Sequence, residues 1–162
     1  MILILTTGGT IDKVYFDARS RYSVGEPQVA MILREAGATT PHRVLMLLQK
    51  DSLDLTGDDR ALVAAHVGLC EETRILVTHG TDTMVETAAA VAEAAAAKGK
   101  TVVFVGSLSP ALHRATDADF NIGFAFAAVQ TLGPGVYVTM NGQIFPYDQV
   151  RKNRDANRFE EA

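Results

Sequence analysis

The chain has 162 residues, of which 48% are hydrophobic and 21% are charged, and its formal net charge is -4. This balance is typical of one globular domain and excludes a disordered chain. An acidic chain gives no electrostatic support to a nucleic-acid partner. No apolar run approaches the roughly 20 residues of a membrane-spanning helix. Residues 1–5 lack the basic segment of a signal peptide, so we expect a cytoplasmic protein with no membrane partner.

The single cysteine, Cys70, excludes an internal disulfide bond. It lies in a helical pattern of apolar residues, which favours a packed core residue over a nucleophile. No cysteine and histidine pair has the spacing of zinc ligands, so the sequence predicts no metal site.

Apolar segments alternate with helical patterns along the chain. This alternation predicts an α/β fold with a doubly wound, mostly parallel sheet and helices on both faces. The predicted strands are 2–6, 44–48, 75–77, 102–105 and 136–140. The predicted helices are 28–37, 58–72, an alanine-rich helix between Thr83 and Lys98, and a helix from about Asp119 to Leu132.

Three further segments are less regular. Residues 13–27 are polar and aromatic without periodicity, and we interpret them as a loop without its own structure, either an active-site lid or a tolerated surface loop. The pair Asn141-Gly142 predicts a tight hairpin turn. The charged tail 151–162 allows a helix at its end.

Polar residues follow three of the predicted strands, at 7–12, 49–54 and 78–83. Ligands of open α/β sheets bind at such strand ends, next to helix N-termini. The paired glycines Gly8 and Gly9 complete no phosphate-loop motif. Taken alone, Thr83 followed by Glu86 favours an ordinary capping box over a catalytic role.

Together these strand ends closely resemble the bacterial-type L-asparaginase/glutaminase family. The resemblance implies a flavodoxin-like amino-terminal domain that hydrolyses the side-chain amide of asparagine without a cofactor. The motifs that carry it are Thr7-Gly8-Gly9-Thr10-Ile11, Asp51-Ser52 and Thr78-His79-Gly80-Thr81-Asp82-Thr83, and the similarity extends through residues 21–25 and 151–153.

The resemblance implies a role for each matched residue. Thr10 stands at the position of the nucleophilic threonine, and Tyr22 matches the tyrosine of a flexible loop that closes over the substrate and assists that threonine. Ser52 matches the residue that binds the substrate's α-carboxylate, and Asp51 beside it is expected in the same substrate-binding group.

The last matched set is Thr81, Asp82 and Lys152, in which the aspartate also receives the substrate's α-ammonium group. The chemistry is consistent with these residue types. A threonine hydroxyl is a weak nucleophile, and a second hydroxyl bonded to a lysine can take its proton. Backbone N–H groups at the following helix start can stabilise an oxyanion. We expect attack on the amide carbon, loss of ammonia and hydrolysis of an acyl-enzyme.

The chain departs from the family in two places. Most members have a carboxyl-terminal domain, from which a neighbouring subunit's glutamate helps bind the α-amino group; we expect a single amino-terminal-type domain over residues 1–162. Leu53 stands where many members have glutamine or a small polar residue. Selectivity between asparagine and glutamine therefore stays open. The apolar helices of so short a chain also predict a homo-oligomer.

The leading hypothesis is a short L-asparaginase that acts on L-asparagine or L-glutamine and needs no cofactor. A second hypothesis is an amino-acid-binding or regulatory module that has lost turnover. A third is the ammonia-releasing amidase subunit of a tRNA-dependent amidotransferase. A nucleotide-binding protein is the least supported, because no phosphate loop is complete.

Overall fold

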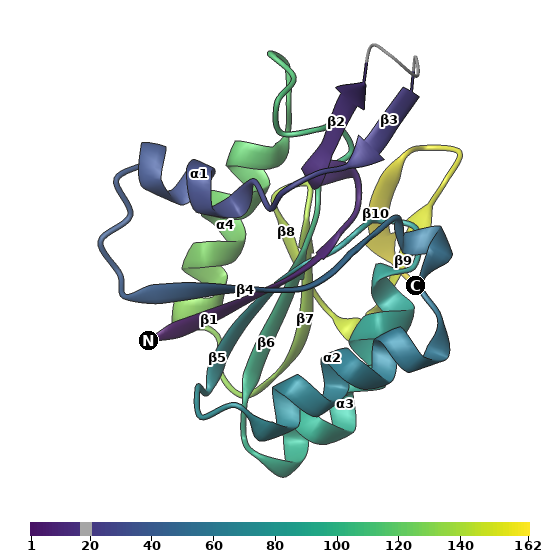
Figure 1. Ribbon diagram of the computed structural model, residues 1–162. Coiled ribbons are helices and arrows are strands. Elements are labelled where there is room, and N and C mark those ends of the chain that lie inside the picture. Colours follow the sequence, from purple (N-terminus) through teal and green to yellow (C-terminus); the bar gives the residue numbers. More distant parts are fainter. Residues whose placement is uncertain (17–20) are drawn as a thin grey trace.

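A six-stranded sheet forms the centre of the computed structural model, which describes residues 1–16 and 21–162 (Figure 1). Its strand order is β4-β1-β5-β6-β7-β8, in which only β8 runs antiparallel to its neighbour. The strands are β1 (Ile2–Gly8), β4 (His42–Lys50), β5 (Arg74–Thr78), β6 (Thr101–Val105), β7 (Gly135–Met140) and β8 (Gln143–Pro146). The predicted doubly wound, mostly parallel sheet is confirmed.

Both faces of this sheet are covered by helices, as Figure 1 shows. Side chains alternate along β1, so that Leu3 and Leu5 face one apolar core and Ile2 and Ile4 face the other. The first core contains residues of α2 (Gly57–Leu69) and α3 (Met84–Ala97), and the second contains residues of α1 (Val29–Glu35) and α4 (Ala118–Thr131). The predicted flavodoxin-like arrangement follows from this topology.

Local signals explain where α2 and α3 begin or end. A capping box of Thr56 and Asp59 starts α2. Gly99, at φ 60°, follows the end of α3 and lets the chain leave the helix in the left-handed conformation that glycine adopts easily. The Nζ of Lys100 donates to the carbonyls of Val67 and Cys70 at the end of α2.

The segment 13–27 contains a hairpin, so the prediction of a loop without its own structure was wrong. Strand β2 (Lys13–Phe16) pairs antiparallel with β3 (Arg21–Val24), and Tyr15 lies opposite Tyr22. Four-residue strands are too short to show a clear period in the sequence. Residues 17–20 of this segment, which the loop prediction includes, lie outside the described residues.

The tail is a second hairpin rather than a helix. Strand β9 (Val150–Asn153) pairs antiparallel with β10 (Arg158–Glu161). The reason is the alternation in β10, where Phe159 is fully buried between the charged residues Arg158 and Glu160. The predicted turn at Asn141-Gly142 is confirmed, because both residues have positive φ and connect β7 to β8.

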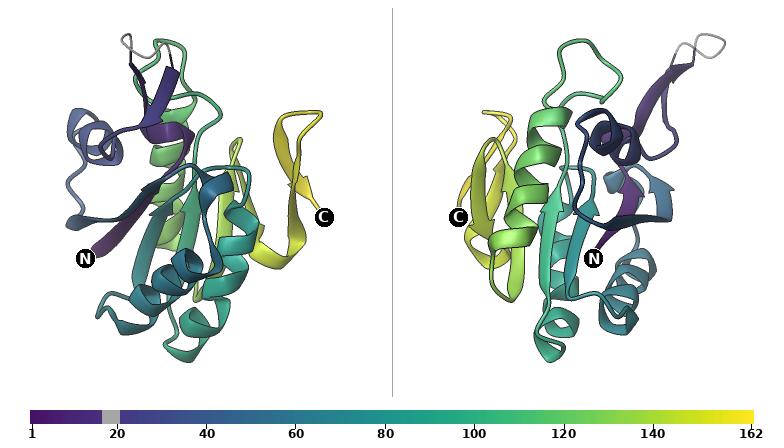
Figure 2. Two further views of the ribbon diagram at one scale, coloured as in Figure 1. Left: turned by 45° about the vertical axis from the view of Figure 1, so that its right-hand side comes forward. Right: turned by 90° about the vertical axis from the view of Figure 1, so that its left-hand side faces the viewer.

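The order of the strands reverses at β1, which lies between β4 and β5. The two hairpins stand near the carboxyl ends of these strands (Figure 2). An open parallel sheet forms its ligand crevice at such a reversal point. No helix in the described part of the chain is long and apolar enough to cross a membrane.

Candidate active site

Thr10 begins a short 3₁₀ turn directly after β1. The turn requires a backbone φ of 90° at Gly9, and residues that have a Cβ atom rarely adopt this conformation. A Cβ atom on Gly9 would lie 2.4 Å from the Cα of Gly80. Because neither Gly9 nor Gly80 has a side chain, the backbone next to Thr10 contacts the loop after β5.

Asp51 and Ser52 follow the end of β4. The carboxylate of Asp51 forms an ion pair with Lys13 at 2.7 Å and accepts a hydrogen bond from the Leu53 backbone at 3.2 Å. Partial burial alone would raise the pKa of Asp51, but these two interactions together hold it below its usual value. Ser52 is only 2% exposed. Sequence reasoning did not anticipate Lys13 as the partner of Asp51.

Thr81, Asp82 and Lys152 meet at one point, although Lys152 is about 70 residues distant in the chain. The Nζ of Lys152 donates to Thr81 Oγ1 at 2.8 Å and to Asp82 Oδ1 at 2.9 Å. Lys152 lies opposite the buried Phe159 in the β9–β10 hairpin, so that core packing fixes the strand that carries it. Arg154 is a looser neighbour, 3.9 Å from Asp82.

Thr83 does not form the capping box expected from the sequence. Its hydroxyl donates to the backbone carbonyl of Ser52 at 2.7 Å, and no side chain caps the first turn of α3. A Cβ atom on Gly80 would lie 2.6 Å from the Ser52 side chain. These two contacts fasten the end of β4 to the loop after β5 and leave N–H groups of α3 available to a ligand.

His79 is fully buried beneath this loop. Its Nδ1 lies 2.7 Å from the Gly80 carbonyl, and its Nε2 lies 2.8 Å from the hydroxyl of Thr87 in α3. Burial lowers the pKa of His79 to about 4, so the imidazole is neutral at physiological pH. The neutral ring of His79 contacts the Gly80 carbonyl on one side and the Thr87 hydroxyl on the other, which fixes the loop carrying Thr81 and Asp82 relative to α3.

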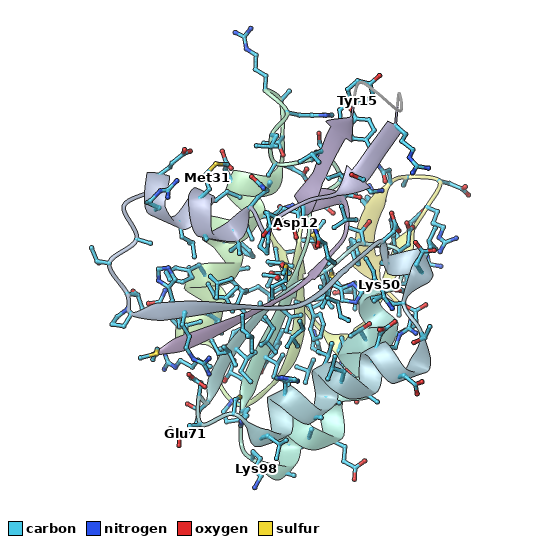
Figure 3. All side chains as sticks on the ribbon, in the orientation of Figure 1. Asp12, Tyr15, Met31, Lys50, Glu71 and Lys98 are labelled. Atoms are coloured by element: carbon cyan, nitrogen blue, oxygen red, sulfur yellow. The ribbon has the colours of Figure 1, made fainter. Side chains whose placement is uncertain are left out.

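Asp12 is a buried carboxyl group at the end of the turn that begins with Thr10. It lies between α1 and the β2–β3 hairpin (Figure 3). Its Oδ1 accepts a hydrogen bond from the Gln28 backbone at 2.8 Å, and its carbonyl accepts one from Gly25 at 2.7 Å. Burial raises the pKa of Asp12 to about 7. Asp12 lies in the polar segment 7–12 that follows the first predicted strand, but the sequence gave no sign that its carboxyl group is buried and has a raised pKa.

Tyr22 lies on β3, and its phenolic oxygen is 3.0 Å from Nε2 of His113 in the loop between β6 and α4. The side chain is half exposed and borders an open hollow of about 560 Å³ next to Asp51 and Leu53. No motif in the sequence points to His113. Only its proximity in space identifies it as a neighbour of the site.

The expected site residues thus fall into three groups. Thr81, Asp82 and Lys152 are joined directly, and Ser52 is tied to the same loop. Thr10 is brought beside that loop by the contact of two glycines. Asp51 pairs with Lys13, and Tyr22 pairs with His113. Among the described residues, no three His, Cys, Asp or Glu side chains are grouped to hold a metal ion.

The fold and this cluster define an α/β domain with a polar site at the reversal point of a parallel sheet. The family model "Asparaginase, N-terminal" matches residues 1–160. The chain therefore belongs to the asparaginase family, as the resemblance of its motifs indicated.

Three relatives with known names are similar in sequence. An L-asparaginase of Thermococcus kodakarensis is 30% identical over 156 residues, which are 93% of this chain and 47% of that protein. A glutaminase-asparaginase of Pseudomonas fluorescens biotype A is 27% identical over an alignment that covers 98% of this chain and 45% of that protein. A probable periplasmic L-asparaginase of Haemophilus influenzae is 28% identical, with coverages of 93% and 46%.

Solved structures of the family have the same fold. A probable cytoplasmic L-asparaginase from Campylobacter jejuni gives a TM-score of 0.84 at 25% identity, over 99% of this chain and 53% of that one. The thermostable L-asparaginase from Thermococcus kodakarensis gives 0.82 at 25% identity, over 99% and 50%. The chain thus spans about half the length of the relatives that it matches.

Proposed function

We propose that this domain hydrolyses the side-chain amide of L-asparagine to give L-aspartate and ammonia. The observation that carries the proposal is the contact of Lys152 with Thr81 and Asp82, at 2.8 and 2.9 Å. A lysine held against a hydroxyl at a strand end is a proton-transfer pair, and a simple ligand-binding pocket has no need of one. The names of the relatives support the same substrate class.

Thr10 is the nucleophile in this proposal. Its oxygen attacks the amide carbon while its proton passes to the Thr81–Lys152 pair. Lys152 then returns a proton to the departing ammonia. Water next attacks the resulting ester, with the same pair accepting its proton, and aspartate is released. Each half of the reaction thus uses one base, which suits a two-step acyl transfer.

The remaining residues bind the substrate. Asp82 carries a negative charge that suits the α-ammonium group, and Ser52 with free N–H groups at the start of α3 suits the α-carboxylate or the oxyanion. Asp51 is already paired with Lys13, so its role is to orient the Ser52 turn next to the substrate. Tyr22 assists Thr10 from the β2–β3 hairpin. No cofactor is required by this chemistry.

The test is release of ammonia and aspartate by the purified chain, with L-asparagine and L-glutamine each varied over a wide concentration range. Turnover of asparagine supports the proposal. Thermal stabilisation by asparagine without turnover would replace it with a binding module. Turnover that appears only when a partner protein is added would instead favour an amidase subunit.

We further propose that the domain self-associates and works in the cytoplasm. Phe120 on α4 is 62% exposed and stacks on Phe124, with ring centroids 6.2 Å apart. An exposed aromatic ring such as that of Phe120 favours association over a solvated monomer. The location is tested by fractionating cells that express the native gene, since one relative is named as periplasmic and one structural neighbour as cytoplasmic.

A further inference from the structure

The loop between β6 and α4, which carries His113, is tied to α4 by the Asp117 carboxylate. Asp117 accepts hydrogen bonds from the backbone N–H groups of Leu108 and Ser109, at 2.9 and 3.0 Å. The amide of Asn121 donates to the same carboxylate at 2.8 Å. One residue thus ties the start of the loop to α4, so that His113 is presented from a fixed support.

This loop also touches the turn that carries the proposed nucleophile. The N–H of Ala111 donates to the carbonyl of Ile11, the residue directly after Thr10, at 3.1 Å. Two residues further on, Nε2 of His113 lies 3.0 Å from the hydroxyl of Tyr22. The loop therefore bridges the Thr10 turn and the hairpin that leaves it.

The rings around Tyr22 restrict its orientation. Tyr15 lies across the hairpin with its ring centroid 5.4 Å from that of Tyr22, and His113 lies on another side at 5.7 Å. Nδ1 of His113 is 3.4 Å from the Ser109 hydroxyl. When Nδ1–H faces Ser109, Nε2 is free to accept the phenolic O–H of Tyr22. This tautomer fixes both the ring of Tyr22 and the direction of its hydroxyl.

We propose that His113 is a positioning residue that sets the Tyr22 hydroxyl for its part in catalysis. The proposal rests on the proposed function, in which Tyr22 assists Thr10. His113 acts only through Tyr22, because its hydrogen bonds run to Tyr22 and to its own loop. Without His113, the half-exposed phenol loses its hydrogen-bond partner and rotates away from a single orientation.

Steady-state kinetics of three variants test the role. We expect His113→Ala to lower kcat by about tenfold, which is the size of one net hydrogen bond, with a smaller change in KM. His113→Gln restores most of the rate, because an amide can also pair with the phenol. Leu112→Ala is the matched control, since Leu112 is an exposed neighbour in the same loop. Equal rates for His113→Ala and Leu112→Ala would overturn the proposal.

The combination with Tyr22→Phe tests whether His113 acts through Tyr22. A positioning role predicts that His113→Ala causes no further loss once the phenolic hydroxyl is gone. Losses that multiply in the double variant would show an independent role and overturn the proposal.

Fluorine NMR of fluorotyrosine-labelled protein separates this inference from the proposed function. The Tyr22 signal is assigned by its disappearance in Tyr22→Phe. We expect His113→Ala to shift or broaden that signal and Leu112→Ala to leave it unchanged. An unchanged Tyr22 signal in His113→Ala overturns the contact itself. A shifted signal in a protein that releases no ammonia would instead refute the proposed function while supporting the contact.

Discussion

Gly9 and Gly80 touch through their backbones, because a Cβ atom on Gly9 would lie only 2.4 Å from the Cα of Gly80. This contact joins the turn after β1 to the loop after β5. It therefore sets the separation between Thr10 on one side and Thr81 with Asp82 on the other. The chemistry proposed for the site depends on that separation.

We expect Gly9→Ala to destabilise the fold and to reduce turnover. Gly9 has φ 90°, and an alanine there combines backbone strain with overpacking, for a total of about 3 kcal/mol. Chemical denaturation measures the change. Gly123→Ala is the control, because a Cβ atom on that helical glycine meets nothing within 4 Å. It should gain up to about 1 kcal/mol. Equal midpoints for the two variants would contradict the steric argument.

The role of Lys152 is tested by its replacement with methionine, which keeps the length of the side chain. Loss of one base contribution should reduce kcat by roughly 100-fold. Arg151→Met is the matched control on the same strand, because Arg151 is exposed and pairs with Glu160 away from the site. We expect it to retain the wild-type rate. An unchanged rate for Lys152→Met would remove Lys152 from the mechanism.

Asp12 makes stability depend on pH in an unusual direction. Its native pKa of about 7 lies above the ordinary value of 3.8, so between these values the native state holds a proton that the unfolded state has lost. The contribution of Asp12 to the free energy of unfolding must therefore fall as pH rises from about 4 to 7, by up to about 4 kcal/mol.

The variant Asp12→Asn isolates this effect. The amide keeps the acceptor for the Gln28 backbone and cannot ionise. We expect wild type and variant to be similar in stability near pH 4 and the variant to be more stable at pH 8. His79 has the opposite effect, because its lowered pKa makes stability rise with pH from about 4 to 6.5. The His79 contribution is the same in wild type and in Asp12→Asn, so it cancels in the difference between their stabilities. A constant difference in stability across this range would contradict the assignment.

Self-association is tested by light scattering. We expect an oligomer at micromolar concentration, and we expect Phe120→Lys to shift it toward monomer by placing a charge where the exposed ring of Phe120 now stands. Glu93→Lys, on a different helix, is the control for the change of charge. A monomeric wild-type protein would contradict the prediction.

The sheet and its main helices could be predicted because apolar runs such as 102–105 and helical spacing such as that of α2 are local signals. The hairpins β2–β3 and β9–β10 could not be predicted from the sequence. Their strands are four residues long and carry charged or aromatic side chains, and only the burial of Phe159 and the pairing of Tyr15 with Tyr22 define them.

The same limit applies to the site. The resemblance of three strand-end motifs to the asparaginase family implied Thr10, Ser52 and Thr81 as site residues, and parallel strands bring such ends to one edge of the sheet. The partners of these residues depend on tertiary contacts. Lys13 beside Asp51 and His113 beside Tyr22 carry no motif of their own. The expected capping role of Thr83 failed because its hydroxyl reaches Ser52 on a different strand end.

Ammonia release by Thr10→Ala, measured beside the wild-type chain with L-asparagine, tests the central claim most directly. The account predicts steady turnover by wild type and none by the variant, with circular dichroism and thermal midpoint essentially unchanged because the Thr10 side chain is only partly buried. Thr10→Ser should retain part of the activity, since it keeps a hydroxyl nucleophile. Ammonia release by Thr10→Ala at the wild-type rate would contradict the assignment of Thr10 as the nucleophile.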